Sequence, residues 1–96
     1  MKCYTLYVGS KNHQGSINAI DDEQVAAITS AAFESFTVLH GHGWFRGQRE
    51  QVRLIKIATD DEESVLALAQ GLRRAMDQDG VGIECDGHYR RITADG

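Results

Sequence analysis

The stretch that decides the fold is FTVLHGHGWFRGQREQVRLIKIA, residues 36–58. Its first part alternates like a strand and then thins out at several glycines, which predicts a bent or bulged strand over residues 36–48. Its last part, residues 51–58, is the densest run of β-branched residues in the chain. Because a short polar turn at residues 47–50 separates the two parts, the sequence predicts a β-hairpin.

A helix is predicted before the hairpin. Asp21 followed three residues later by Gln24 is a capping-box pattern, in which the carboxylate accepts hydrogen bonds from the free N–H groups of a helix start. Val25 and Ile28 then recur at helical spacing, and the helix is expected to end near Ser35.

A second helix is predicted after the hairpin. It begins at another capping box, Thr59 or Asp60 followed by Glu62 and Glu63, and it ends before Gly80. Its apolar residues recur at helical spacing and form the expected buried stripe: Val65, Leu68, Ala69, Leu72 and Met76.

Strands are predicted at both ends of the chain. Residues 2–10 alternate aromatic and β-branched side chains, and a long loop at residues 10–18 follows. Residues 81–85 form the last strand, which can resume after Gly87 and run to Ile92. This order predicts an α+β fold, the ferredoxin-like βαββαβ plait, with a four-stranded antiparallel sheet and two helices on one face.

Length and composition exclude several classes of protein. The 96 residues fit a single domain, 1–96, and 42% hydrophobic with 25% charged residues is ordinary for a globular protein. No apolar run approaches the ~20 residues of a membrane span, and no signal peptide is evident, so we expect a cytoplasmic protein with no membrane partner. The net charge of −4 opposes general nucleic-acid binding.

Apolar residues on both faces of one strand predict a homo-oligomer. In residues 51–58, Val52 and Leu54 point to one face and Ile55 and Ile57 to the other. One face of the sheet is expected to carry no helix, so its apolar side chains call for a partner. The alternative is that the C-terminal tail covers this face.

The hairpin also concentrates the residues that are able to form a site. His40, His42, Trp44 and Arg46 alternate, so a regular strand would project all four from one face. A histidine can act as general base, Arg46 can clamp an anion, and Trp44 can stack on a ring. The alternative is a solvated edge strand whose Trp44 packs on a neighbouring subunit or helix.

Arginines form a small positive cluster around the hairpin turn, which suits an anionic ligand; ordinary surface charge is the alternative. We therefore predict no catalytic residue but a binding site, formed by His42, Trp44, Arg46, Arg49 and Arg53.

No metal site or cofactor is predicted. The chain has no CxxC motif; His40 and His42 can supply two ligands, and Asp86 and His88 can supply others. Cys3 and Cys85 are expected to be buried free thiols, although the predicted pairing of the terminal strands can bring them near each other. The acidic neighbours of Cys85 disfavour a nucleophilic thiolate.

Three motifs resemble a group of short uncharacterised proteins of bacteria, phages and other mobile elements. These motifs are Leu6-Tyr7-Val8-Gly9, then Phe36-Thr37-Val38 leading to Gly43-Trp44-x-x-Gly47 with Glu50 after it, and Gln78-Asp79-x-Val81-Gly82. The resemblance implies a small ferredoxin-like domain of phage or mobile-element origin. It implies no activity, cofactor or catalytic residue.

The main functional interpretation is a small, non-enzymatic, homo-oligomeric binding or regulatory protein. Its hairpin would hold an anionic small molecule or dock on a protein partner. The alternative is a small oligomeric ferredoxin-like enzyme, with His40 or His42 as acid or base and Arg46 as an anion clamp between packed sheets. The enzyme needs a histidine in a water-poor cleft near Arg46, whereas the binding protein displays Trp44 on its surface.

Overall fold

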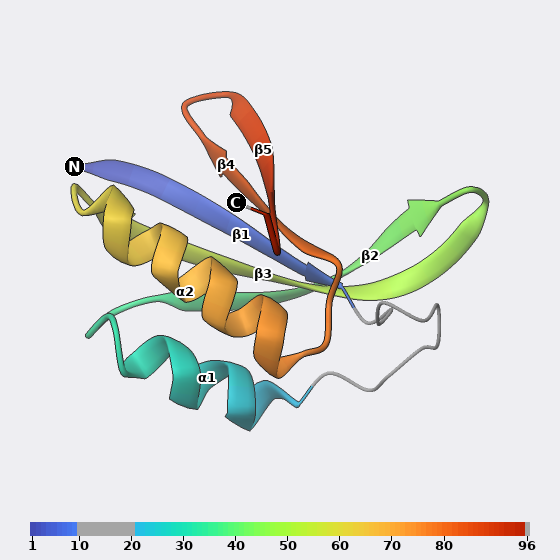
Figure 1. The fold of residues 1–96 in the computed structure, drawn as a ribbon, viewed down its shortest axis with the longest axis horizontal. Helices are drawn as coiled ribbons and strands as arrows, with labels where there is room; N and C mark the ends of the chain where they lie inside the picture. The colour runs from blue at the N-terminus through green and yellow to red at the C-terminus, as the bar shows by residue number, and fades with distance from the viewer. Residues whose placement is uncertain (10–20, 96) are drawn as a thin grey trace.

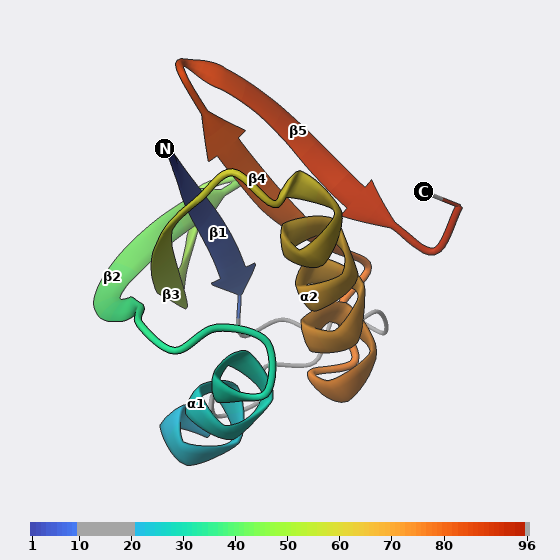
Figure 2. The ribbon, with the colours of Figure 1, turned by 90° about the vertical axis from the view of Figure 1, so that its left-hand side faces the viewer.

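The computed structural model describes residues 1–9 and 21–95, and within them two helices pack on one face of a five-stranded antiparallel sheet (Figures 1 and 2). The element order is β1 (Lys2–Gly9), α1 (Asp22–Ser30), β2 (Thr37–Phe45), β3 (Gln48–Thr59), α2 (Glu62–Ala75), β4 (Gly80–Cys85) and β5 (His88–Thr93). The strands lie in the order β2-β3-β1-β4-β5. The α+β class is confirmed. The predicted loop at residues 10–18 lies outside the described residues.

The expectation of four strands is wrong, because residues 88–93 form a strand of their own. Asp86 and Gly87 have φ angles of 53° and 79°, and this two-residue turn returns the chain as β5 alongside β4. Arg46 and Gly47, with φ angles of 51° and 78°, join β2 to β3 in the same way. Positive φ at both central residues is the type I′ geometry of tight hairpins. The hairpin turn is thus shorter, and begins earlier, than the predicted turn at residues 47–50.

Both helices begin at an aspartate that accepts hydrogen bonds from free backbone N–H groups. Asp21 accepts from the N–H groups of Glu23 and Gln24 at 3.0 and 3.2 Å, as the first capping box predicts. The second cap is Asp61 rather than Thr59 or Asp60; it accepts from the N–H and hydroxyl of Ser64 at 3.1 and 2.6 Å. Hydrogen bonds from Ser64 hold the pKa of Asp61 below its usual value.

The core lies between the helices and the inner face of the sheet. The predicted stripe of α2 is buried except for Met76, which is partly buried at the C-cap. α1 ends at Ser30 rather than near Ser35, and Phe33 packs against the core from the connection that follows. The buried strand residues of the core, in β1, β3, β4 and β5, are Tyr4, Leu6, Val8, Ile55, Ile57, Val81, Ile83 and Ile92.

The other side of the sheet carries no helix, and we call it the open face (Figure 2). Val52 and Leu54 point to this face and are partly buried, while Ile55 and Ile57 are buried beneath the helices, so the predicted division of side chains in β3 is confirmed. Among residues 1–9 and 21–95, no helix is long and apolar enough to cross a membrane.

Candidate functional site

The hairpin places three of its predicted site residues on one face of β2. His40, His42 and Trp44 occupy alternate positions, and their partners in β3 are Arg53, Gln51 and Arg49. The expectation that Arg46 shares this face is wrong, because β2 ends at Phe45 and Arg46 lies in the turn.

The hairpin tip is a surface feature. Trp44 is 66% exposed and Phe45 58% exposed, and the tip extends well past the helices (Figure 1). The Arg46 guanidinium lies over the Phe45 ring, 5.2 Å from its centroid. His42 is also exposed. This geometry suits contact with another molecule and does not supply the water-poor cleft that a histidine acid or base would need.

Arg53 does not join the arginines of the hairpin tip. It is only 8% exposed, and its Nε donates a hydrogen bond of 2.7 Å to Oδ1 of Asp22. Nε2 of His40 lies 2.9 Å from the other oxygen of the same carboxylate. The bond from Arg53, supported by its charge and by His40, holds the pKa of Asp22 below its usual value. Arg53 therefore joins α1 to the sheet, and a free ligand would have to displace Asp22 to reach it.

The open face holds a set of glycines that we call the glycine floor: Gly9 in β1, and Gly80 and Gly82 in β4. The β1–β4 register, continued by two residues, places Gly9 opposite Gly80. Side chains of β5 lie over Gly80 and Gly82. A Cβ at Gly82 would lie 2.5 Å from the Tyr89 hydroxyl, and one at Gly80 would lie 2.7 Å from Cζ of Arg91. The floor thus lets neighbouring side chains approach the backbone closely.

The carboxylate of Glu50 lies at the edge of the glycine floor. A Cβ at Gly9 would lie 3.4 Å from Oε1 of Glu50 and 3.5 Å from the amide oxygen of Gln78. The amide nitrogen of Gln78 donates to the Met76 carbonyl at 3.0 Å, and its amide oxygen faces Gly9. Oε2 of Glu50 is buried, and no described residue forms a hydrogen bond with it. Such an oxygen is costly to bury, so this position suits a cationic or donor group of a ligand.

Sequence reasoning did not identify Glu50 as a candidate site residue. In the sequence analysis, Glu50 is named only as the residue that follows the Gly43-Trp44-x-x-Gly47 motif. The signal that could have found it is the alternation of β3, which puts Glu50 in phase with Val52 and Leu54 on the open face. A carboxylate in line with two apolar side chains on the same face needs a hydrogen-bond donor or a cation if it is buried.

Two tyrosines and a glutamate lie along the floor from Glu50. The rings of Tyr7 and Tyr89 meet edge to face, with centroids 6.0 Å apart and planes inclined at 64°. The Tyr7 hydroxyl donates to Oε1 of Glu84 at 3.3 Å. Burial raises the pKa of Tyr7, and the nearby Glu84 charge raises it further. Tyr89 remains 62% exposed, so an aromatic surface is available to a ligand.

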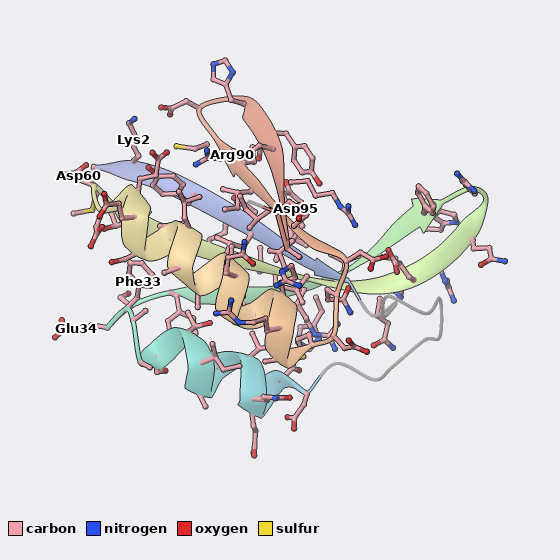
Figure 3. The ribbon with its side chains drawn as sticks, viewed as in Figure 1. Lys2, Phe33, Glu34, Asp60, Arg90 and Asp95 are labelled. Atoms are coloured by element: carbon pink, nitrogen blue, oxygen red, sulfur yellow. The ribbon has the colours of Figure 1, made fainter. Side chains whose placement is uncertain are left out.

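A hollow of about 290 Å³ lies at the end of the sheet where β1 begins, and Tyr89 is among the residues that line it. Lys2 and Arg90, labelled in Figure 3, line it together with Cys85, and Arg90 pairs with Glu62 at 3.4 Å. Burial, reinforced by Asp86, raises the pKa of the Cys85 thiol, which disfavours a nucleophile.

A second hollow, of about 310 Å³, lies at the C-terminal end of α2. Glu50 lines neither hollow. Cys3 and Cys85 are both free, but the expectation that both are buried is wrong, because Cys3 is exposed and Cys85 is only partly buried. Within residues 1–9 and 21–95 no cluster of three or more His, Cys, Asp or Glu side chains could hold a metal ion.

Comparisons with protein-family models and with curated protein sequences find no match. Among solved structures, the chain is similar to a phage SAM lyase in its apo state, with a TM-score of 0.71 and 22% identity over 99% of this chain and 90% of that one. It is also similar to a phage SAM lyase in complex with S-methyl-5′-thioadenosine, with a TM-score of 0.65 and 21% identity over 98% of this chain and 90% of that one. At these identities the likeness establishes a shared fold.

Proposed function

We propose that this chain is a small enzyme that cleaves S-adenosylmethionine and releases S-methyl-5′-thioadenosine. The likeness to phage SAM lyase over nearly the whole of both chains supports this reaction. The observation that carries the proposal within this chain is the buried carboxylate oxygen of Glu50, which has no hydrogen-bond donor among the described residues. The comparisons thus favour the enzyme alternative over a non-enzymatic binding protein.

The chemistry follows from the difference between substrate and product. Methylthioadenosine keeps the methyl and adenosyl groups, so the bond that breaks joins sulfur to the four-carbon amino-acid chain. The electron pair of that bond goes to sulfur, and the sulfonium becomes a neutral thioether. The carboxylate oxygen of the amino-acid chain forms the new bond to the same carbon and closes a lactone. Atoms and charges balance without water or an added proton.

Glu50 suits the ammonium group of this substrate better than its sulfonium. The sulfonium loses its charge in the transition state, so a carboxylate beside it would stabilise the ground state more and slow the reaction. The ammonium keeps its charge and offers three donors. Glu50 and the neighbouring amide oxygen of Gln78 supply acceptors for them. Fixing the ammonium would orient the chain so that its own carboxylate attacks.

The reaction needs no histidine. A thioether is a neutral leaving group that requires no proton, so the exposure of His42 and the engagement of His40 with Asp22 are compatible with this chemistry. This modifies the enzyme alternative, which had a histidine as acid or base.

We also infer that the first four strands and both helices form a ferredoxin-like plait, and that the open face packs against further copies of the chain. The strand order β2-β3-β1-β4 and the apolar side chains of Leu39, Val52 and Leu54 support these two inferences. Light scattering at micromolar concentration should give at least twice the monomer mass. A monomeric solution would contradict the assembly.

The reaction is tested by incubating the protein with S-adenosylmethionine and following methylthioadenosine by liquid chromatography and mass spectrometry. Wild-type protein should form it well above the rate without protein, and Glu50→Gln should lower the rate roughly 10-fold or more, as for loss of a charged hydrogen bond. Glu34→Gln, at an exposed carboxylate, is the matched control and should retain the wild-type rate (Figure 3). Product formation at the background rate, or equal rates for both variants, would overturn the proposal.

The exposed aromatics of the hairpin tip favour a second function, docking on a protein partner or another copy. Trp44 and Phe45 are large apolar groups on a projecting turn, and Arg46 and Arg49 surround them with positive charge. In this second function, the predicted binding residues His42, Trp44, Arg46 and Arg49 keep their role. Arg53 does not take part, because its guanidinium is bonded to Asp22 of α1.

A further inference from the structure

We infer that Tyr7, Tyr89 and Glu84 form the subsite for the adenine base, which fixes the direction in which the substrate lies on the open face. This inference rests on the proposed function and deepens it. It gives a role in binding the base to aromatic and acidic side chains that have no role in the cleavage step.

The two tyrosines form an aromatic corner rather than a buried pair. Their planes meet at 64°, and the Tyr89 ring rests on the backbone of Gly82 while remaining 62% exposed. A base that stacks on the Tyr89 ring therefore presents its edge toward Tyr7. Stacking on an aromatic side chain is a common way for proteins to hold a base.

Glu84 supplies the polar group that reads the edge of the base. Its Oε1 already accepts a hydrogen bond from the Tyr7 hydroxyl at 3.3 Å, which orients the carboxylate beside the aromatic corner. An ionised carboxylate is an acceptor only, so it selects a base with a donor at that edge. The exocyclic amino group of adenine is such a donor, whereas hypoxanthine carries a carbonyl oxygen at the same position.

The spacing along β1 fits a single nucleoside substrate. Tyr7 and Gly9 point to the same face two residues apart, which is about 7 Å along a strand. Glu50 lies beside Gly9, so the ammonium site and the aromatic corner are neighbours on the open face. The ribose and sulfur would lie between them, beside the Arg91 side chain that covers Gly80.

The test measures binding of S-methyl-5′-thioadenosine by isothermal titration calorimetry. Tyr89→Ala should raise the Kd roughly 5- to 150-fold, the range for loss of one base–aromatic stack. His88→Ala changes the neighbouring exposed residue of β5, which points to the opposite face, and should leave the Kd unchanged. Circular dichroism verifies that both variants fold.

Glu84 is tested through base preference. Wild-type protein should bind S-methyl-5′-thioadenosine more tightly than S-methyl-5′-thioinosine by roughly 10-fold, and Glu84→Gln should narrow this ratio because its amide can turn a donor toward the inosine carbonyl.

The outcomes separate this subsite from the proposed reaction. If Glu50→Gln abolishes product formation but Tyr89→Ala and Glu84→Gln bind like wild type, the base subsite is wrong and the reaction stands. Tyr89-dependent binding without product formation would support the subsite and overturn the reaction. Absence of binding by wild-type protein overturns the subsite.

Discussion

Arg53 donates a 2.7 Å hydrogen bond to Asp22, and this contact joins β3 to the first residue of α1 across 31 positions of sequence. The guanidinium is nearly buried, whereas the carboxylate remains partly exposed and also meets His40. A buried arginine depends on its partner, because without it the charge would be left unpaired in the interior. Asp22 therefore adds a polar contact to the apolar packing of Val25 and Ile28 that holds α1 against the core.

Acid should destabilise the fold through Asp22 and Asp61. Both carboxyls have pKa values below normal in the folded protein, Asp22 because of Arg53 and Asp61 because of Ser64. The unfolded chain takes up these protons at the ordinary pKa of about 3.9, so the stability they provide is complete above that pH and is lost as the pH falls through the lower folded values.

Denaturant midpoints between pH 2 and pH 6 measure this effect. Asp22→Asn and Asp61→Asn should each lower the midpoint at pH 6 and flatten its decline in acid. Glu34→Gln, at an exposed residue, is the control and should follow the wild-type profile. Equal slopes for all four proteins would show that the two contacts do not contribute to stability.

Leu72→Ala should be strongly destabilising. Leu72 is fully buried in the stripe of α2, so its truncation leaves a cavity and costs about 2 to 5 kcal/mol of the free energy of unfolding. Arg74→Ala, at an exposed position of the same helix, is the control and should cost less than about 1 kcal/mol. Urea denaturation of the two variants checks the difference; an equal loss would mean that the α2 stripe does not carry the core.

The sequence predicts those parts of the fold that depend on local pattern. Asp21 caps α1, the stripe of α2 faces the core, and β3 divides its side chains between two faces, all as short-range spacing requires. The sequence does not predict β5 as a separate strand, because residues 88–92 read as a continuation of the strand that ends at Cys85. In the structure, Asp86 and Gly87 form a tight turn, and β5 pairs antiparallel with β4.

The site was harder to predict because its contacts join distant residues. The sequence does not distinguish Arg53 from Arg46 and Arg49. In the fold, Arg53 is the one of the three that forms a hydrogen bond with Asp22, the first residue of α1. Alternation places Glu50 on the open face with Val52 and Leu54, but only the fold brings Gly9 and Gln78 close to it. Neither contact can be inferred from alternation within one strand.

Gly82→Ala should impair nucleoside binding without unfolding the protein. A Cβ at this position would lie 2.5 Å from the Tyr89 hydroxyl, so the ring must move away from the floor. The ring is exposed and has room to move, so the free energy of unfolding should change by less than about 1 kcal/mol. The Kd for S-methyl-5′-thioadenosine should rise as it does for Tyr89→Ala. Wild-type affinity in Gly82→Ala would show that the position of the ring is unimportant.

The hairpin tip gives the last prediction. Trp44 is 66% exposed and contributes nothing to the core, so Trp44→Ala should leave the denaturation midpoint nearly unchanged. If the tip docks on another copy or on a protein partner, Trp44→Ala and Arg46→Ala should each weaken that association by roughly 1 to 4 kcal/mol, the range for truncation of a hot-spot residue. Sedimentation velocity over a concentration series measures self-association.

Salt separates the roles of these two residues. Arg46 should lose its contribution at high ionic strength, because exposed charges are screened over ~8 Å in physiological salt, whereas the indole of Trp44 should retain most of its effect. Gln51→Ala, at an exposed position of β3, is a control that should alter neither association nor stability. If Trp44→Ala unfolds the protein instead, the indole is structural, and the docking surface must lie on the open face rather than at the tip.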